Sequence, residues 1–173
     1  MITIDDPDDP RLDDYRHLTD ASARRAIESG RAAHGIFVAE GPVALEQLYA
    51  SGLTIRSVLM TPSRAASLPP PPTGVALHVA PRMILAAAAG YDVHRGVLAA
   101  AERPAPNDPG DIVSGARRVL VREAVSDNEN VGSLFRNAAA LGIDALLLDR
   151  SCTDPFYRRS IRVSSGWSMR LPH

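Results

Sequence analysis

The chain alternates between short apolar runs and segments whose apolar residues recur at helical spacing. Strands are expected at the apolar runs, residues 35–39, 55–60, 75–79 and 97–101. Helices are expected between or before them, at residues 21–31, 42–50 and 81–89. Pro42 suits a first helical turn, and Gly52 and Gly90 stand just after helix ends. This regular alternation predicts a small α/β domain of about 100 residues.

The second part of the chain contains a strand, a polar loop, a helix and another strand. The strands are expected at residues 119–125 and 144–149, and the helix runs from Asn130 towards Gly142. A short helix is expected at residues 110–115, and residues 154–167 begin as a loop and become helical. Because two strands and one good helix cannot cover both faces of a parallel sheet, this βαβ unit is expected to be incomplete.

Two proline-rich segments divide the sequence. Residues 69–72 are four consecutive prolines, which predict an extended surface loop. Residues 103–109 contain three more prolines and lie between two complete element patterns. We therefore expect a first domain over residues 1–103, a linker over residues 104–110 and a second domain over residues 111–173.

The helix from Asn130 has an apolar stripe and a face of small and polar residues. The stripe consists of Val131, Leu134, Phe135, Ala138 and Leu141. The other face consists of Gly132, Ser133, Arg136, Asn137 and Ala140. Glycine in a helix costs about 1 kcal/mol relative to alanine, which makes sense if another backbone or a ligand approaches closely. A purely structural alternative stays open, in which Asn130 caps the helix, Gly132 relieves crowding and Arg136 is a solvated charge.

The charge of the chain is unevenly distributed. The net charge is −1, but the first 20 residues hold seven acidic residues and two arginines. The remaining residues hold 17 arginines and 13 acidic residues, and the chain has no lysine. Arginine suits bidentate phosphate contacts and stacking on bases. Because a codon bias towards arginine gives the same composition, the charge permits RNA binding without demonstrating it.

Composition disfavours several other classes of protein. No apolar run reaches the length of a membrane span and the N-terminus is acidic, so a cytoplasmic protein without a membrane partner is expected. A single cysteine, Cys152, excludes an intrachain disulfide, and the five histidines lack ligand spacing, so no metal is expected. Cys152 could act as a nucleophile, but no base lies near it in sequence and an inert thiol is favoured. The spacing Gly-x-Gly-x-x-Gly of dinucleotide sites is also absent.

Two motifs resemble those of the SpoU (TrmH-like) RNA ribose methyltransferases of the knotted SPOUT superfamily. Asn130-x-Gly132-x-x-x-Arg136-Asn137-Ala138, after a strand, resembles the family's first motif. The segment from Asp154 to Trp167 resembles the second, with Arg159, Arg162, Ser164 and Gly166 at matching positions. Arg159 stands where the family often has lysine. Pro10-Arg-Leu, a helix with Arg24 and Arg25, and the run from Gly35 to Gly41 resemble the family's substrate-binding domain, a small α/β module similar to ribosomal RNA-binding proteins.

This resemblance implies methyl transfer from S-adenosylmethionine to a ribose 2′-hydroxyl of rRNA or tRNA, on an α/β-knot domain with a parallel sheet. Arg136 would be the central catalytic residue, with Asn130 orienting substrate and Ser164 at the site. Arginine is a poor base because its pKa exceeds about 12, so a positioning and electrostatic role is easier to accept. The arginines that would contact RNA are Arg24, Arg25, Arg158, Arg159 and Arg162.

One part of the family pattern is not found. The third motif, a glycine-rich loop with an acidic residue followed by Ser-Leu-Asn, has no counterpart up to His173. In the family this segment makes most of the cofactor pocket and ties the knot. The chain is therefore expected to be a partial methyltransferase, with cofactor-binding residues unknown, weak or absent cofactor binding, and a doubtful homodimer where the family usually dimerises.

Three functions are weighed on the sequence. The first is an RNA 2′-O-methyltransferase, and the second is a non-catalytic RNA-binding module with a vestigial methyltransferase domain. The third is an unrelated α/β interaction domain.

Overall fold

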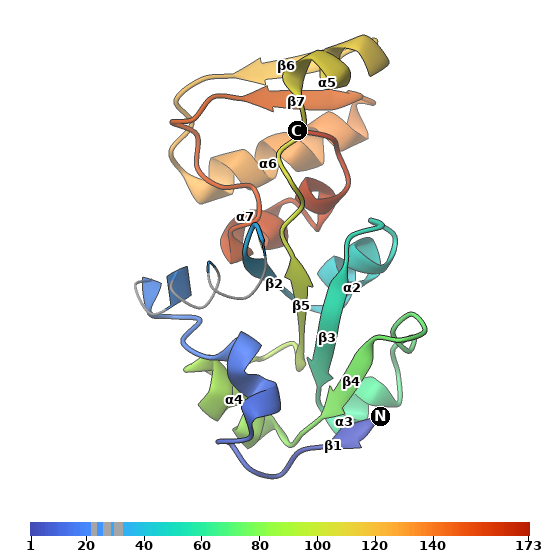
Figure 1. Ribbon diagram of the computed structural model, residues 1–173, viewed down its shortest axis with the longest axis vertical. Helices are drawn as coiled ribbons and strands as arrows, with labels where there is room; N and C mark the ends of the chain where they lie inside the picture. The colour runs from blue at the N-terminus through green and yellow to red at the C-terminus, as the bar shows by residue number, and fades with distance from the viewer. Residues whose placement is uncertain (22–23, 26–28, 30–32) are drawn as a thin grey trace.

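One mixed sheet forms the larger part of the molecule (Figure 1). The computed structural model describes residues 1–21, 24–25, 29 and 33–173. Within these residues the sheet has the strand order β1-β4-β3-β5-β2. The strands are β1 (Ile2–Thr3), β2 (Ile36–Glu40), β3 (Ile55–Met60), β4 (Ala76–Val79) and β5 (Val97–Glu102). β1, β4 and β3 are parallel, and β5 is antiparallel to both its neighbours, so the ends of β2, β3 and β4 lie at the same edge as the start of β5.

Helices connect these strands and cover both faces of the sheet. They are η1 (Pro10–Tyr15), α2 (Pro42–Tyr49), α3 (Pro62–Ala65) and α4 (Arg82–Ala89). Proline occupies an early position of η1, α2 and α3, where its missing N–H costs nothing. α4 ends at Gly90, which adopts a left-handed conformation (φ 80°) that glycine accepts without strain.

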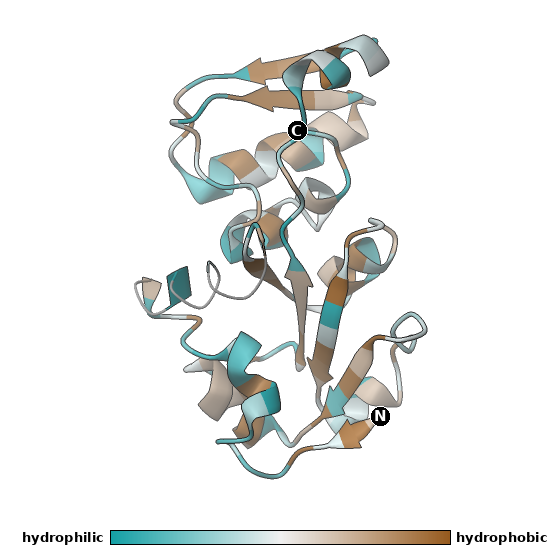
Figure 2. Cartoon of the chain, in the orientation of Figure 1, coloured by the Kyte–Doolittle hydropathy of each residue, from teal (hydrophilic) through white to brown (hydrophobic). Residues whose placement is uncertain are grey.

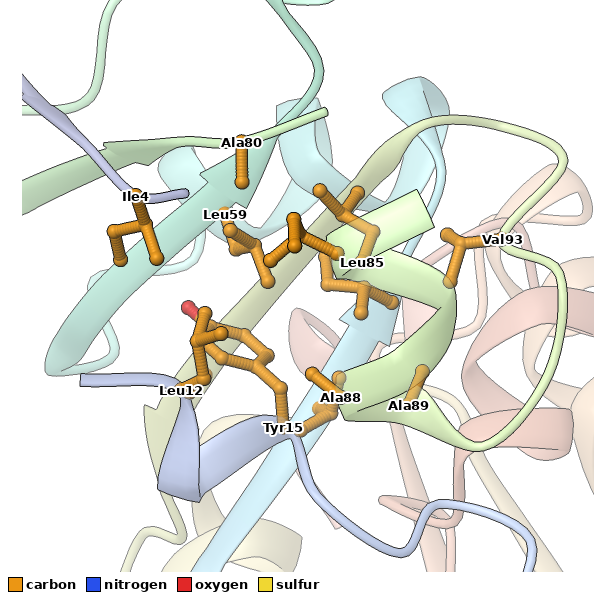
Figure 3. Packing of buried hydrophobic residues seen from close by; sticks show 13 residues of the cluster. Ile4, Leu12, Tyr15, Leu59, Ala80, Leu85, Ala88, Ala89 and Val93 are labelled. Carbon is orange, nitrogen blue, oxygen red and sulfur yellow. The ribbon is translucent and has the colours of Figure 1, made fainter. Parts of the chain in front are cut away.

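Each face of this sheet has its own hydrophobic core. On one face, Leu12 and Tyr15 of η1 pack with Leu85 of α4 against Leu59 of β3 (Figure 3). The hydroxyl of the fully buried Tyr15 lies 2.7 Å from Ser57 Oγ, so its polar end is satisfied. On the other face, α2 buries Ala44, Leu45 and Leu48 against the sheet.

A second, two-stranded sheet lies at the far end of the molecule (Figure 1). Its strands, β6 (Val119–Arg122) and β7 (Ala145–Leu148), are parallel. The surrounding helices are α5 (Pro109–Gly115), α6 (Asn128–Ala140), α7 (Arg158–Val163) and η2 (Trp167–Met169). Figure 2 shows hydrophobic residues along β6 and β7 and hydrophilic residues at the start of α6. Val131, Phe135 and Ala138 of α6 pack against Leu146 of β7.

α7 joins the two parts of the molecule. It packs against β2, an edge strand of the larger sheet (Figure 1). Ile161 of α7 and Met169 of η2 belong to the same hydrophobic cluster as Phe37 and Ala39 of β2. Arg103 Nη2 also forms an ion pair with Asp154 Oδ2 at 2.7 Å. The two sheets are therefore held together by a common core as well as by the connecting chain.

The α/β class and most of the expected elements are confirmed. Most expected boundaries move by about one residue, and two move further: β6 stops at Arg122 because Ala124 turns the chain with φ 56°, and α6 starts at Asn128 rather than Asn130. Leu141 was expected in the buried stripe of α6, but it is the exposed residue after the helix end. The elements β1, η1 and α3 were not anticipated. The helix expected at residues 21–31 lies largely outside the described residues.

Candidate functional site

The start of α6 is fixed by Asp127. Its carboxylate oxygen Oδ1 accepts a hydrogen bond from the backbone N–H of Asn130 at 2.8 Å, which satisfies one of the unpaired donors of the first turn. Asn130 is therefore not the capping residue. Its side chain is exposed and lines a cleft of about 440 Å³ at the carboxyl end of β6.

Gly132 is the point at which α6 and α7 touch. It is buried, and a Cβ atom there would lie 2.7 Å from the carbonyl oxygen of Ser160 and 2.8 Å from Val163 Cβ. Both distances are shorter than a real Cβ tolerates, so the two helix backbones can approach this closely only because residue 132 has no side chain. The contact brings the two motif segments of the sequence side by side.

Arg136 follows Gly132 by about one helical turn. Its side chain is exposed, and within the described residues it has no hydrogen bond or ion pair. A guanidinium in this state is available for an external anion. The neighbouring Asn137 is also exposed and lines the cleft beside Asn130.

Arg159 and Arg162 present further positive charge on α7. Arg159 forms an ion pair with Glu129 in the first turn of α6, and this carboxylate raises the pKa of the Arg159 guanidinium above its usual value. Arg162 is exposed and has no ion pair within the described part of the chain. Among the described residues, Arg136 and Arg162 are thus exposed cations without an ion-pair partner on two packed helices, whereas Arg159 is paired with Glu129.

Arg158 turns in a different direction, towards the larger sheet. Its Nη1 atom lies 3.0 Å from Oε2 of Glu40, a buried carboxylate at the end of β2, and its guanidinium stacks 4.4 Å from the ring centre of Tyr91. Tyr91 donates its hydroxyl to the same Glu40 oxygen at 2.8 Å, and burial raises the pKa of this tyrosine. Together with Arg162, Arg158 lines a cleft of about 170 Å³.

Glu40 and Tyr91 were not predicted as site residues. Glu40 is separated from Arg158 by 118 positions, and no spacing in the sequence connects them. Glu40 ends a buried strand, but nothing in the sequence indicates which group its carboxylate binds.

Ser164 is completely buried between α7 and η2. Its Oγ atom donates to the carbonyl of Ile161 at 2.9 Å and lies 3.2 Å from Ser168 Oγ. Its backbone nitrogen lies against Gly132. Ser164 is therefore not exposed as the arginines of α7 are. Its hydroxyl forms hydrogen bonds that stabilise the turn after α7.

The two arginines expected to bind RNA near the N-terminus differ in exposure. Arg24 is 7% exposed, and its Nη1 atom donates to the carbonyl of Asp14 at 2.6 Å. Arg25 is exposed, and its Nε atom donates to the carbonyl of Ala21 at 3.1 Å. Only Arg25 offers its charge to solvent.

Other kinds of site have less support in the structure. Cys152 Sγ lies 3.4 Å from the backbone nitrogen of Val125 and 3.7 Å from the carbonyl of Arg122, contacts that hold two loops together. The described residues contain no group of three or more His, Cys, Asp or Glu side chains placed to hold a metal ion. No helix among them is both long and apolar enough to span a bilayer.

Comparison with known proteins gives consistent results. No family model matches the chain. An uncharacterized tRNA/rRNA methyltransferase of Mycobacterium tuberculosis is 41% identical over 170 residues, which cover 97% of this chain and 58% of that protein. The 23S rRNA guanosine 2′-O-methyltransferase of Bacillus subtilis is 34% identical over 64 residues, which cover 37% of this chain and 26% of that protein.

Solved structures share the fold. The rRNA methyltransferase of Sinorhizobium meliloti with bound AdoMet superposes with a TM-score of 0.73 at 20% identity, covering 98% of this chain and 62% of that one. The SpoU methyltransferase AviRb of Streptomyces viridochromogenes, in complex with AdoMet, gives 0.69 at 19% identity, covering 95% and 62%. The fold is therefore that of SpoU-type RNA methyltransferases.

Fold, motifs and relatives agree with one another. The chain is similar in sequence to proteins named tRNA/rRNA methyltransferases and in fold to SpoU methyltransferases. It spans 58% of the length of the mycobacterial relative.

Proposed function

We propose that this chain carries the RNA-binding side of a methyltransferase that transfers a methyl group from S-adenosylmethionine to a ribose 2′-hydroxyl of rRNA or tRNA. The observation that supports this most directly is the contact at Gly132. It brings α6, which bears Arg136, against α7, which bears Arg159 and Arg162. The relatives named tRNA/rRNA methyltransferases and the 2′-O-methyltransferase of Bacillus subtilis support the same substrate class.

In this proposal, Arg136 stabilises and orients rather than abstracts a proton. Guanidinium is protonated at any physiological pH, so it can hold an RNA phosphate and favour negative charge developing on the attacking ribose oxygen. Arg162 adds a second open cation on the neighbouring helix. Asn130, exposed beside the cleft at the end of β6, can donate and accept hydrogen bonds to the ribose.

The division into domains is also part of the proposal. Residues 1–103 would bind the RNA, residues 104–110 would link, and residues 111–173 would belong to the methyltransferase domain. β5 ends at Glu102 and α5 begins at Pro109, which is consistent with a linker at this place.

S-adenosylmethionine is proposed as the methyl donor because it is present in solved structures with this fold. The described residues do not by themselves fit it: the lining of the cleft of about 440 Å³ beside Asn130 includes no aromatic side chain against which the adenine ring could pack. Asp127 is already used as the cap of α6. Calorimetry with S-adenosylmethionine should therefore detect no micromolar binding by this chain.

Methyl transfer can be tested at millimolar S-adenosylmethionine, so that weak donor binding does not hide the chemistry. Ribosomal and transfer RNA would be incubated with the wild type, digested to nucleosides and analysed for 2′-O-methylnucleosides by mass spectrometry. Arg136→Ala should lower the yield by at least about 100-fold, the usual effect of removing one electrostatic stabiliser. Arg117→Ala, an exposed arginine after α5, is the matched control and should leave the yield unchanged. RNA binding without any methylation would favour the non-catalytic RNA-binding module instead.

A further inference from the structure

A second cationic cleft lies at the edge of the larger sheet, away from α6. The turn after β3, the start of α4 and the turn before β5 meet at this edge and enclose about 390 Å³. The backbone N–H of Thr61 donates to the carbonyl of Gly96 at 3.0 Å, which closes the floor of the cleft. Its polar lining includes Thr61, Ser63, Arg64, Arg82, His94 and Arg95.

Two glycines allow arginine side chains to lie flat against the backbone here. A Cβ atom on Gly96 (φ 67°) would lie 3.0 Å from Thr61 Oγ1 and 3.3 Å from Arg64 Cγ. A Cβ atom on Gly41 (φ 97°) would lie 2.7 Å from Arg95 Cδ, because the side chain of Arg95 crosses the start of α2. Both positions combine a left-handed backbone with a close neighbour, so a larger residue would be strained and would displace an arginine.

The cleft has more positive charge than its surroundings neutralise. None of the residues that line it in the described part of the chain is acidic. Asp92, just outside, is committed to Arg82 through two hydrogen bonds of 2.8 and 2.7 Å. Arg64 uses Nε to bind the carbonyl of Arg95 at 3.0 Å, and Arg95 itself has no hydrogen bond or ion pair from its side chain within the described residues.

The chemistry of the lining selects the ligand. The guanidinium groups of the exposed Arg95 and the half-buried Arg64, with hydroxyls from Thr61 and Ser63, match phosphate oxygens. The lining contains no Phe, Tyr or Trp on which a base could stack, so contact with the sugar–phosphate backbone is favoured over recognition of a nucleobase. We propose that this cleft, held between Arg64 and Arg95, binds the phosphodiester backbone of RNA at a distance from the methylation site. The proposal rests on RNA being the substrate.

The position of the cleft suggests a path for the RNA. Arg95 lies over Gly41, and the preceding residue, Glu40, holds Arg158 of α7. The Glu40–Gly41 turn therefore stands between the cleft and the arginines of α7. A strand bound in the cleft would pass this turn and reach Arg162, so the larger sheet would set the register in which RNA meets α6.

The test is binding of the whole chain to fragmented ribosomal RNA, measured by filter binding over a series of salt concentrations. The variants are Arg64→Ala with Arg95→Ala, the same pair changed to lysine, and Arg117→Ala as the matched control. The alanine pair should bind at least about 10-fold more weakly at low salt, with a salt dependence reduced by about one to two ion contacts. The lysine pair should keep most of the affinity, and the control should match the wild type. Circular dichroism and urea unfolding check that the variants fold.

The possible outcomes distinguish RNA binding by this cleft from the broader proposal that RNA is the substrate. Equal binding by wild type and alanine pair would overturn the cleft while leaving RNA as the substrate. No RNA binding by the wild type at low salt would overturn both. A parallel titration with inorganic phosphate, followed through the Nε–H resonances of arginine, identifies the source of the anion. If phosphate shifts the Arg64 and Arg95 signals and RNA does not, the cleft serves a free anion and the RNA proposal is wrong.

Discussion

The carboxylate of Glu40 and the guanidinium of Arg158 connect two segments that lie 118 positions apart in the chain. The Oε2 atom of Glu40 receives Arg158 Nη1 at 3.0 Å and the hydroxyl of Tyr91 at 2.8 Å. The pair connects the second motif segment, residues 154–167, to Glu40, the last residue of β2. Arg158, which the sequence suggested as an RNA ligand, is thereby used inside the protein.

Replacing Glu40 by glutamine should weaken this attachment. The variant keeps the size of the side chain but removes the charge that compensates the partly buried Arg158, so the free energy of unfolding should fall by about 1–3 kcal/mol. Urea unfolding measures the change. Glu46→Gln, an exposed residue of α2, is the control and should stay within about 0.5 kcal/mol of the wild type. Equal stability of the two variants would show that the Glu40–Arg158 pair contributes nothing net.

Gly132→Ala should drive α6 and α7 apart. The new Cβ would meet backbone and side-chain atoms of α7 at less than 3.0 Å, and overpacking of this kind costs about 1–3 kcal/mol, of which better helix propensity returns about 1. A net loss of up to about 2 kcal/mol is expected in urea unfolding. Gly115→Ala in α5, where no atom lies within 4 Å of the added Cβ, should be neutral or stabilise by about 0.4–1 kcal/mol. A stabilising Gly132→Ala would contradict the close contact.

Ser164→Ala and Arg136→Ala should separate structure from catalysis. Ser164 is buried and hydrogen-bonded within the protein, so its alanine variant should lose about 1 kcal/mol of stability and methylate RNA nearly as well as the wild type when folded. Arg136 is exposed, so its alanine variant should unfold like the wild type and yet lose methylation. Unfolding curves and nucleoside analysis on the same preparations make the comparison. A folded Ser164→Ala protein without activity would show that Ser164 takes part in methyl transfer.

Stability should decrease on mild acidification because of His78. Burial lowers the pKa of this imidazole below its ordinary value of 6.5, the nearby Arg11 lowers it further, and Asp9 opposes the shift. The unfolded chain therefore takes up a proton at a pH where the folded chain resists it. The contribution of His78 to the free energy of unfolding is complete above about pH 6.5. It is lost as the pH falls from there through the pKa that His78 has in the folded protein.

This pH dependence can be measured by urea unfolding between about pH 7.5 and about pH 5.5. His78→Gln should flatten the profile, whereas His34→Gln, at an exposed position, should not. His173, whose pKa is also lowered by burial, should account for part of the remaining slope. A profile unchanged by His78→Gln would show that this histidine binds its proton equally well in the folded and the unfolded chain, which would contradict the lowered pKa.

Local patterns in the sequence determined most elements of the fold, and contacts between distant residues determined the rest. β3 was predicted with the bounds it has, because its apolar run is flanked by turn residues, and α4 ends at Gly90 as expected. η1 was missed because a short 3-10 helix has no long apolar period, although it buries Leu12 and Tyr15. The end of β6 depends on Ala124, whose left-handed backbone no propensity predicts.

The candidate site shows the same difference. The motif residues Gly132 and Arg136 could be found from their spacing, and Gly132 was correctly expected where something approaches closely. That the neighbour is α7 could not be deduced, since Ser160 and Val163 are about 30 residues away in sequence. The sequence also does not reveal which arginines have partners inside the protein. Arg24 and Arg158 do, whereas Arg136 and Arg162 face solvent.

The shared core of Phe37, Ala39, Ile161 and Met169 has a consequence for the modularity of this protein. A fragment ending after β5 would leave Phe37 and its neighbours bare on an edge strand, a surface prone to self-association. The two parts of the molecule cannot be exchanged independently between relatives, because the residues of β2 and of α7 and η2 that form the shared core must be exchanged together. Substitutions in β2 and in α7 should therefore be inherited in matched pairs, although the two segments lie far apart in the chain.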